Sequence, residues 1–433
     1  MVSGECQWQE EGVYNLVSVL GIFILILFAW LISNNKKIIN YRLIIWGIGL
    51  QLFIAGFVFL FPAGTKFFMW LNTAVVKLLD AASSGSRFIF GRLALPPGEN
   101  ESLGFILAFQ AFPTIIFFSA LMGILYFYGI MQWIIKGFAY VFTRFMRVSG
   151  AESLCAASNI FVGIESALTI KPFLRNMTDS ELHTVLTAGM ATVASNVLAL
   201  YIFTLKDLFP GIAGHLISAS LLSAPAALVI SKLVYPEKGK PETLGIHVEP
   251  HYERETNIFE AIINSSMEGV KLIVGIVALL ISVLGLVALV DMLLGWIGNL
   301  LHMDGLSLKL ILKFIYYPFT VILGVPVNEA KAAAGIIGER MILTEVVGYQ
   351  DLATAIKTGA ISMRTAVITA YSLCGFAHFA SMAIFVGGIS ALVPERKRDL
   401  ARVGFRALIS AILATLMTGA VAGLFFTGKS MIF

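Results

Sequence analysis

The sequence predicts an all-α polytopic membrane protein. Of its 433 residues, 58% are hydrophobic and only 13% are charged, whereas a soluble domain carries about 25% charged residues. The mean hydropathy of +0.87 excludes a soluble globular enzyme, and a chain this apolar is not disordered. The formal net charge of +4 gives no reason to expect a nucleic-acid partner.

Seven apolar stretches are long enough to cross a bilayer, which takes about 20 residues. They are residues 13–34, 42–63, 103–129, 184–204, 211–231, 270–298 and 404–427. Residues 66–82 (KFFMWLNTAVVKLLDAA) mix charges with an apolar stripe. That pattern predicts a helix lying in the membrane interface rather than crossing it.

Two further apolar segments are interrupted near their middles. Residues 153–170 contain VGIESA, and residues 308–343 contain LGVPVNEA. Each interruption places glycine and a carboxylate where a continuous helix favours neither. Irregular backbone at membrane depth is tolerated only where it lines a protein cavity, so we expect two re-entrant helical hairpins.

The two interruptions occupy corresponding places in the two halves of the chain. An apolar helix that contains several polar residues follows each interruption. Paired broken segments are typical of inverted-repeat transporters whose site lies at the midplane. The expected organisation is therefore N-terminal helices and an interfacial helix (1–102), a first repeat (103–235), a polar linker (236–258) and a second repeat (259–433).

The distribution of basic residues predicts the orientation. The N-terminal segment is acidic, whereas Lys36, Lys37 and Arg42 follow the first span. A second basic cluster, from Arg396 to Arg406, precedes the last span. Both termini are therefore expected outside.

Three glutamates near the interruptions are candidates for a site: Glu165, Glu329 and Glu345. A charge at the bilayer centre costs about 2.5–3.5 kcal/mol on insertion scales, so each either solvates a turn at the interface or faces a cavity as a hydrogen-bond acceptor. Small polar residues gather around the same breaks. They often only join helices, but their clustering at two related positions favours a site; they are Asn159, Thr192, Ser195, Asn196, His378 and Ser381.

Three segments together resemble the concentrative nucleoside transporters: residues 157–195 (ASNIFVGIESALTIKPFLRNMTDSELHTVLTAGMATVAS), 343–349 (LTEVVGY) and 368–388 (ITAYSLCGFAHFASMAIFVGG). The resemblance extends from about residue 85 to the C-terminus. It implies eight transmembrane helices, an interfacial helix, two re-entrant hairpins, a homotrimer and an elevator-type movement of the hairpin-bearing part.

The resemblance also implies a site. The ribose of a nucleoside should meet Glu345, His378 and Ser381, while Glu165 and Ile164 of the first hairpin line the same pocket and Phe376 and Val197 lie against the substrate. The sodium site of the family falls on Asn159, Val162, Thr192 and Val193. Oxygen ligands of this kind suit a hard cation.

Some positions depart from the family pattern. The first hairpin of the family usually reads Gly-Gln-Thr/Ser-Glu, but Gly163, Ile164 and Glu165 form a tip one residue shorter that lacks the glutamine and the hydroxyl. His378 stands where the family has asparagine. The sugar-facing acids are kept and the base-facing edge is altered, so we expect a ribosyl substrate with an atypical base preference.

The sequence thus predicts a secondary active importer of nucleosides driven by a cation gradient, with sodium favoured as the coupling ion and no other cofactor. An alternative keeps the fold but carries a modified nucleoside, a nucleobase or a related solute. Proton coupling through His378 is also open, because histidine titrates near neutral pH. No HExxH or GxSxG motif supports an enzyme, and the short loops favour a bacterial inner membrane.

Overall fold

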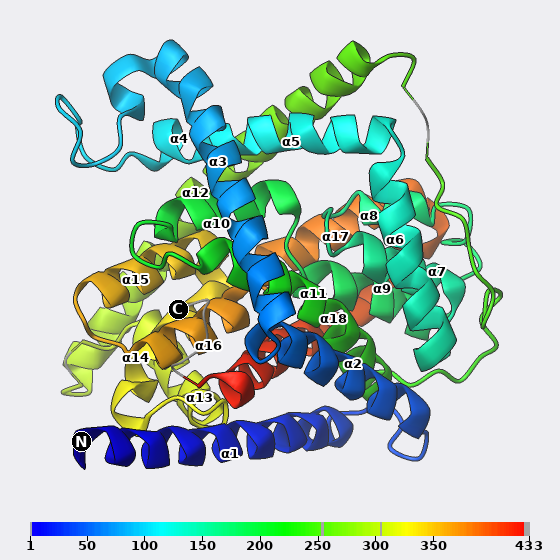
Figure 1. Ribbon diagram of the computed structural model, residues 1–433. Helices are drawn as coiled ribbons and strands as arrows, with labels where there is room; N and C mark the ends of the chain where they lie inside the picture. The colour runs from blue at the N-terminus through cyan, green and yellow to red at the C-terminus, as the bar shows by residue number, and fades with distance from the viewer. Residues whose placement is uncertain (1, 253–254, 304, 428–433) are drawn as a thin grey trace.

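The computed structural model (Figure 1) describes residues 2–252, 255–303 and 305–427, and for residues 2–11 the backbone alone. All regular elements in these ranges are helices, as the composition predicts. The α-helices are α1 Val2–Leu31, α2 Tyr41–Phe59, α3 Pro62–Phe90, α4 Leu107–Gln110, α5 Phe112–Phe127, α6 Ile130–Val141, α7 Gly150–Ser158, α8 Ser166–Thr169, α9 Asp179–Ala191, α10 Ser195–Leu205, α11 Ile212–Val234, α12 Ile258–Leu300, α13 Leu308–Ile322, α14 Val327–Leu343, α15 Glu345–Lys357, α16 Met363–Leu373, α17 Phe379–Leu392 and α18 Lys397–Phe425. Shorter turns are η1 Gly91–Ala94, the π-helical η2 Phe142–Met146 and η3 Pro394–Arg396.

Within the described ranges, seven segments are long and apolar enough to cross a membrane. Each overlaps one of the seven predicted stretches. The largest difference is at α12, which is 43 residues long and begins well before the predicted start at residue 270. The Asn257 side chain accepts from the Glu260 amide at 3.0 Å and so caps a helix whose first turns are polar.

The predicted interfacial helix at 66–82 is the middle of the longer helix α3. Pro62 occupies the first helical position, where a missing amide hydrogen costs nothing. Gly91 ends the helix with φ +53, a conformation that favours glycine. The polar stretch after residue 82 (SSGSR) carries no apolar stripe, and the sequence pattern therefore did not predict that the helix continues to Phe90.

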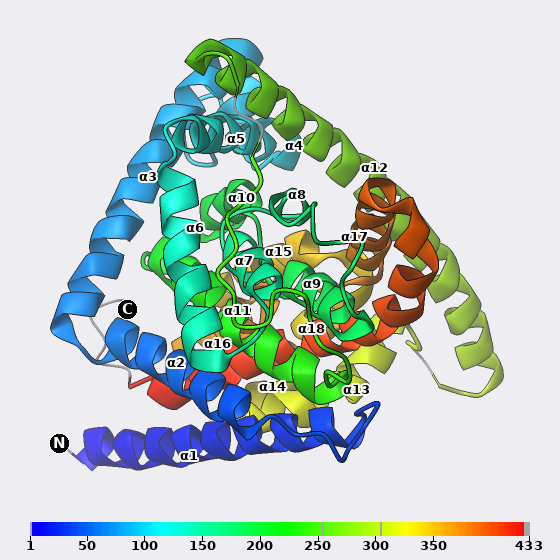
Figure 2. The same cartoon turned by 90° about the vertical axis from the view of Figure 1, so that its right-hand side faces the viewer.

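Long helices frame the molecule. In Figure 2, α1, α3 and α12 form the sides of a roughly triangular outline around the other helices. The most apolar window of α12 is only 6% buried, whereas those of the α9–α10 segment, α11 and the α18 segment are each 83% buried. The helices of the core therefore pack on one another, while α12 presents its apolar surface outwards.

Each half of the chain contains an interrupted hairpin and an interrupted helix. In the first half, residues 159–165 separate α7 from α8, and residues 192–194 separate α9 from α10. In the second half, residues 323–326 separate α13 from α14, and residues 374–378 separate α16 from α17. In the first hairpin, predicted at 153–170, the second limb is α8, a single helical turn.

Candidate functional site

The interrupted helices meet one another through their main chains. The Phe376 amide, in the break between α16 and α17, donates to the Thr192 carbonyl between α9 and α10 at 3.2 Å. The Ser195 amide at the start of α10 donates to the Phe161 carbonyl in the hairpin break at 2.8 Å. Because free backbone groups at helix ends must find partners, these contacts bring both halves of the chain together at one place.

A buried carboxylate lies at this meeting point. Glu345, the first residue of α15, is 1% exposed. Its Oε1 accepts from the Tyr201 hydroxyl of α10 at 2.5 Å, and its Oε2 lies 3.2 Å from His378 Nε2. Neither Oε2 nor Nε2 has the alignment of a full hydrogen bond within the described structure, so Oε2 keeps acceptor capacity for another group.

The hydrogen bond at Nδ1 determines which tautomer the neutral His378 ring adopts. His378 Nδ1 accepts from the Ser381 amide at 3.1 Å, as the cap of α17. An acceptor nitrogen carries no proton, so the neutral ring holds its hydrogen on Nε2, on the side of Glu345. His378 can therefore donate toward Glu345 without taking up a second proton.

A cavity of about 970 Å³ opens beside this cluster. Several predicted site residues line it: Val162, Ile164, Glu165, Thr192, Val197 and Phe376. Glu345, His378 and Ser381 do not, and all three are buried. Phe376 connects the two groups, because it lines the cavity and its ring centre lies 5.0 Å from that of His378.

The two predicted acids therefore lie in different environments. Glu165 is exposed on the wall of the cavity, whereas Glu345 is enclosed by protein. Ser381 is also turned away from the cavity, since its hydroxyl donates to the Phe376 carbonyl and, at 2.7 Å, to the His378 carbonyl. The third candidate acid, Glu329, accepts from the Ser362 amide at 3.0 Å and from the Ser362 hydroxyl at 2.8 Å, and so holds the residue that caps α16, which is a structural role.

The residues expected to hold sodium present oxygen atoms in unwound backbone. Asn159 is buried, and its Oδ1 accepts from Ser166 at 2.9 Å, which leaves that oxygen a second lone pair. The Thr192 hydroxyl donates to the Ala188 carbonyl at 2.9 Å, so its lone pairs stay free. In the described chain the carbonyls of Val162 and Val193 accept no hydrogen bond. These donor groups fit a hard monovalent cation, and no cluster of three histidine, cysteine or acidic side chains among the described residues offers an alternative metal site.

Sequence reasoning missed two contacts of the site. Tyr201 lies in the apolar run LALYIF. The one signal there is its hydroxyl, since a buried tyrosine hydroxyl usually has a hydrogen-bond partner. Ile164 at the hairpin tip packs on α17, because a Cβ placed on Gly388 would come within 2.1 Å of Ile164 Cδ1. Such a close approach cannot be read from either segment alone.

Comparison with known proteins identifies the family. Family models described as "Na+ dependent nucleoside transporter N-terminus", "Nucleoside recognition" and "Na+ dependent nucleoside transporter C-terminus" match residues 20–93, 108–208 and 215–423. An uncharacterized transporter of Haemophilus influenzae is 35% identical over 420 residues, which cover 95% of this chain and 97% of that protein. The chain belongs to the concentrative nucleoside transporter family.

Other members of the concentrative nucleoside transporter family are longer. Solute carrier family 28 member 3 of Mus musculus and sodium/nucleoside cotransporter 1 of Rattus norvegicus are each 35% identical to this chain. The matches cover 95% and 96% of this chain, but only 59% and 64% of those proteins. This chain therefore spans less than two thirds of the length of these mammalian relatives.

Solved structures of CNTnw share the fold of this transporter. The inward-facing, substrate-bound state has a TM-score of 0.87 at 32% identity, covering 95% of this chain and 98% of that one. A CNTnw variant in an outward-facing state has a TM-score of 0.88 at 32% identity, covering 96% and 99%. The all-α membrane fold predicted from the sequence is thus confirmed.

Proposed function

We propose that this transporter imports nucleosides by secondary active transport, with sodium as the coupling ion. The observation that carries the proposal is Glu345, a buried carboxylate whose Oε2 keeps acceptor capacity beside His378 Nε2, next to a cavity to which both halves of the chain contribute. The similarity to sodium/nucleoside cotransporter 1 of Rattus norvegicus supports the same function.

The chemistry of Glu345 suits a ribose. An ionised carboxylate accepts hydrogen bonds from sugar hydroxyls, and each such charge-assisted bond contributes about 1.5–3 kcal/mol. On this proposal the sugar reaches Glu345 past Phe376, which lines the cavity and packs beside His378, the neighbour of Glu345. Glu165 and Val197 then contact the substrate from the cavity wall. The apolar Ile164 replaces a polar base-facing group, and this favours an atypical base preference.

Sodium supplies the driving force in this scheme. Asn159, Val162, Thr192 and Val193 provide the oxygen ligands, and each cation that moves down about 100 mV contributes about 2.3 kcal/mol. Binding of the cation and of the nucleoside must favour each other reciprocally. Proton coupling through His378 is less favoured, because a second proton would have to occupy Nδ1, which already accepts the Ser381 amide.

The remaining features of the proposal concern assembly and movement. The exposed apolar surface of α12 supports self-association as a homotrimer in the membrane. The interrupted segments in residues 103–235 and 259–433 support two inverted repeats that move together as an elevator. We place both termini outside a bacterial inner membrane, in accord with the basic residues that follow α1.

Uptake into proteoliposomes tests this function. Radiolabelled uridine, cytidine, adenosine, guanosine and inosine are offered under an inward sodium gradient and under a potassium gradient, with a Glu345→Gln variant. Glu395→Gln is the matched control, since Glu395 is exposed in the short turn η3. Sodium-stimulated uptake that Glu345→Gln strongly reduces and the control retains supports the proposal. Absence of uptake for all five nucleosides, or equal uptake in both gradients, would refute it.

A further inference from the structure

A second cavity, of about 740 Å³, lies away from the transport site. It is bounded by the start of α2, the π-helical turn η2 and the polar linker after α11. Its lining contains four cationic side chains, Arg42, Arg144, Arg147 and Lys232, but only two carboxylates. The transport mechanism proposed above uses none of these residues.

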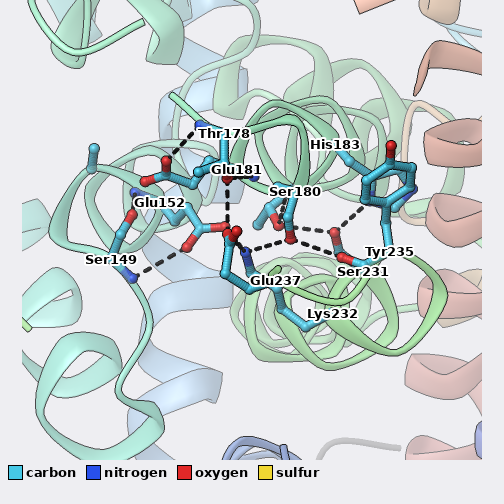
Figure 3. A network of polar contacts seen from close by, with 12 residues as sticks. Ser149, Glu152, Thr178, Ser180, Glu181, His183, Ser231, Lys232, Tyr235 and Glu237 are labelled. Carbon is cyan, nitrogen blue, oxygen red and sulfur yellow. Dashed lines mark hydrogen bonds and ion pairs between the residues drawn. The ribbon is translucent and has the colours of Figure 1, made fainter. Parts of the chain in front are cut away.

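The two carboxylates share one cation, Lys232. Figure 3 shows Lys232 between them, with Nζ 2.5 Å from Glu152 Oε1 and 3.3 Å from Glu237 Oε2. Glu152 also accepts from the Ser149 amide at 3.2 Å as part of the cap of α7. This network forms one wall of the cavity and keeps a net charge of −1, so that with the three arginines the charged side chains of the lining sum to +2.

Among the described residues, the three arginines have no acidic partner. Arg42 is fixed by donating to the carbonyls of Phe145 at 3.1 Å and Arg144 at 3.3 Å. Arg144 and Arg147 are exposed and form no ion pair within the described residues. Three guanidinium groups on one cavity wall make a strongly anion-attracting surface, and guanidinium matches the oxygens of a phosphate in a two-pronged contact.

The surroundings of the cavity indicate where the anion comes from. Trp46 of α2 and Phe145 of η2 are 45% and 39% exposed, and their ring centres lie 4.8 Å apart. Tyr41 and Ile45 on the same turns of α2 are also exposed. Aromatic side chains at the end of a membrane-spanning helix mark the level of the lipid headgroups. The arginines thus lie next to apolar side chains that face acyl chains.

We propose that this cavity binds the phosphate headgroup of an anionic phospholipid. Arg144 and Arg147 hold the phosphate, Arg42 supports them, and the acyl chains follow the exposed side chains of α2. The basic residues after α1 place this end of the molecule at the cytoplasmic leaflet. Basic pockets between helices on that side bind anionic headgroups.

Lipid binding to the purified full chain tests the proposal. Native mass spectrometry in detergent measures the affinity for phosphatidylglycerol, for phosphatidylcholine and for inorganic phosphate. The test variant carries Arg144→Gln and Arg147→Gln. The matched control carries Lys397→Gln and Arg398→Gln, two exposed basic residues at the start of α18 that do not line the cavity.

The parent and the control should bind phosphatidylglycerol in preference to phosphatidylcholine. The test variant should bind it about 30-fold more weakly, the loss expected for two basic residues at an anionic surface. Replacement of both arginines by lysine should restore part of the affinity, which shows that the loss does not come from misfolding. Equal binding of phosphatidylglycerol by parent and test variant would overturn the proposal. Binding of inorganic phosphate that displaces the lipid would overturn the assignment to a phospholipid.

Discussion

Replacing Tyr201 by phenylalanine isolates the contact that holds the buried carboxylate. The Tyr201 hydroxyl is 2.5 Å from Glu345 Oε1, and the ring stacks on Tyr349 with centres 4.3 Å apart. Tyr201→Phe therefore removes one hydrogen bond to a charged group and keeps the ring packing. We expect weaker transport, because Glu345 loses the donor that fixes its orientation and stabilises its charge.

The expected magnitude follows from the kind of bond that is lost. A hydrogen bond to a charged group contributes about 1.5–3 kcal/mol, which corresponds to a decrease of about 10- to 150-fold in kcat/KM. Tyr349→Phe is a matched control, because its hydroxyl donates to the neutral Ala370 carbonyl at 3.0 Å. That bond contributes only about 0.5–1.5 kcal/mol. The control should therefore lose less activity than the test variant.

Sodium-driven uptake in proteoliposomes measures both variants, alone and combined with Glu345→Gln. If the hydroxyl acts through the carboxylate, Tyr201→Phe should lose most of its effect in the Glu345→Gln background, with a coupling energy above about 1 kcal/mol. The reasoning is refuted if Tyr201→Phe and Tyr349→Phe behave alike. An increase in substrate affinity in Tyr201→Phe would also refute it, because the hydroxyl would then compete with the sugar.

Three further predictions concern other parts of the molecule. Gly388→Ala should impair uptake, because the added Cβ would lie 2.1 Å from Ile164 Cδ1 and would displace that side chain; in the Ile164→Ala background the same change should have little effect, and an equal loss in both backgrounds would show that the contact is not the cause. Burial alone would raise the pKa of Glu237, but the Lys232 ammonium holds it below its ordinary value. The ionised form therefore stabilises the fold at neutral pH, and this contribution is lost as the pH falls through the depressed pKa; the melting temperature of Glu237→Gln should accordingly fall less between pH 7 and acid pH than that of the parent. Thr192→Val should raise the sodium concentration for half-maximal uptake about tenfold, the effect of losing about 1.4 kcal/mol, and an unchanged sodium dependence would remove Thr192 from the cation site.

Much of the membrane fold could be predicted because continuous apolar runs determine it. The predicted span 211–231 corresponds closely to α11, Ile212–Val234. The limits of α3 were harder, since the polar stretch SSGSR interrupts its apolar stripe before the last turn and its end depends on the backbone conformation of Gly91. Length and hydropathy therefore predict where helices cross, but terminal residues decide where they end.

The candidate site was predicted less completely, because it depends on contacts between distant segments. The importance of Glu345 followed from a charged residue in an apolar context and from the family resemblance. Its contact with Tyr201 did not, since that residue lies 144 positions away in an apolar run. The sequence also could not reveal that the Ser381 hydroxyl donates to main-chain carbonyls, because a serine in an apolar helix can equally face a ligand.

The hydrogen bond between the Phe376 amide and the Thr192 carbonyl has a consequence for how specificity can vary. On the proposed function, it joins the segment of Phe376, which contacts the substrate, to the segment of Thr192, which binds sodium. The contact is made by main-chain groups, and every amino acid except proline supplies both a peptide N–H and a carbonyl. Side chains around it can be exchanged, as with histidine at position 378, without breaking this connection. On the proposed function, substrate preference can therefore differ between relatives while the binding of ion and the binding of substrate remain coupled.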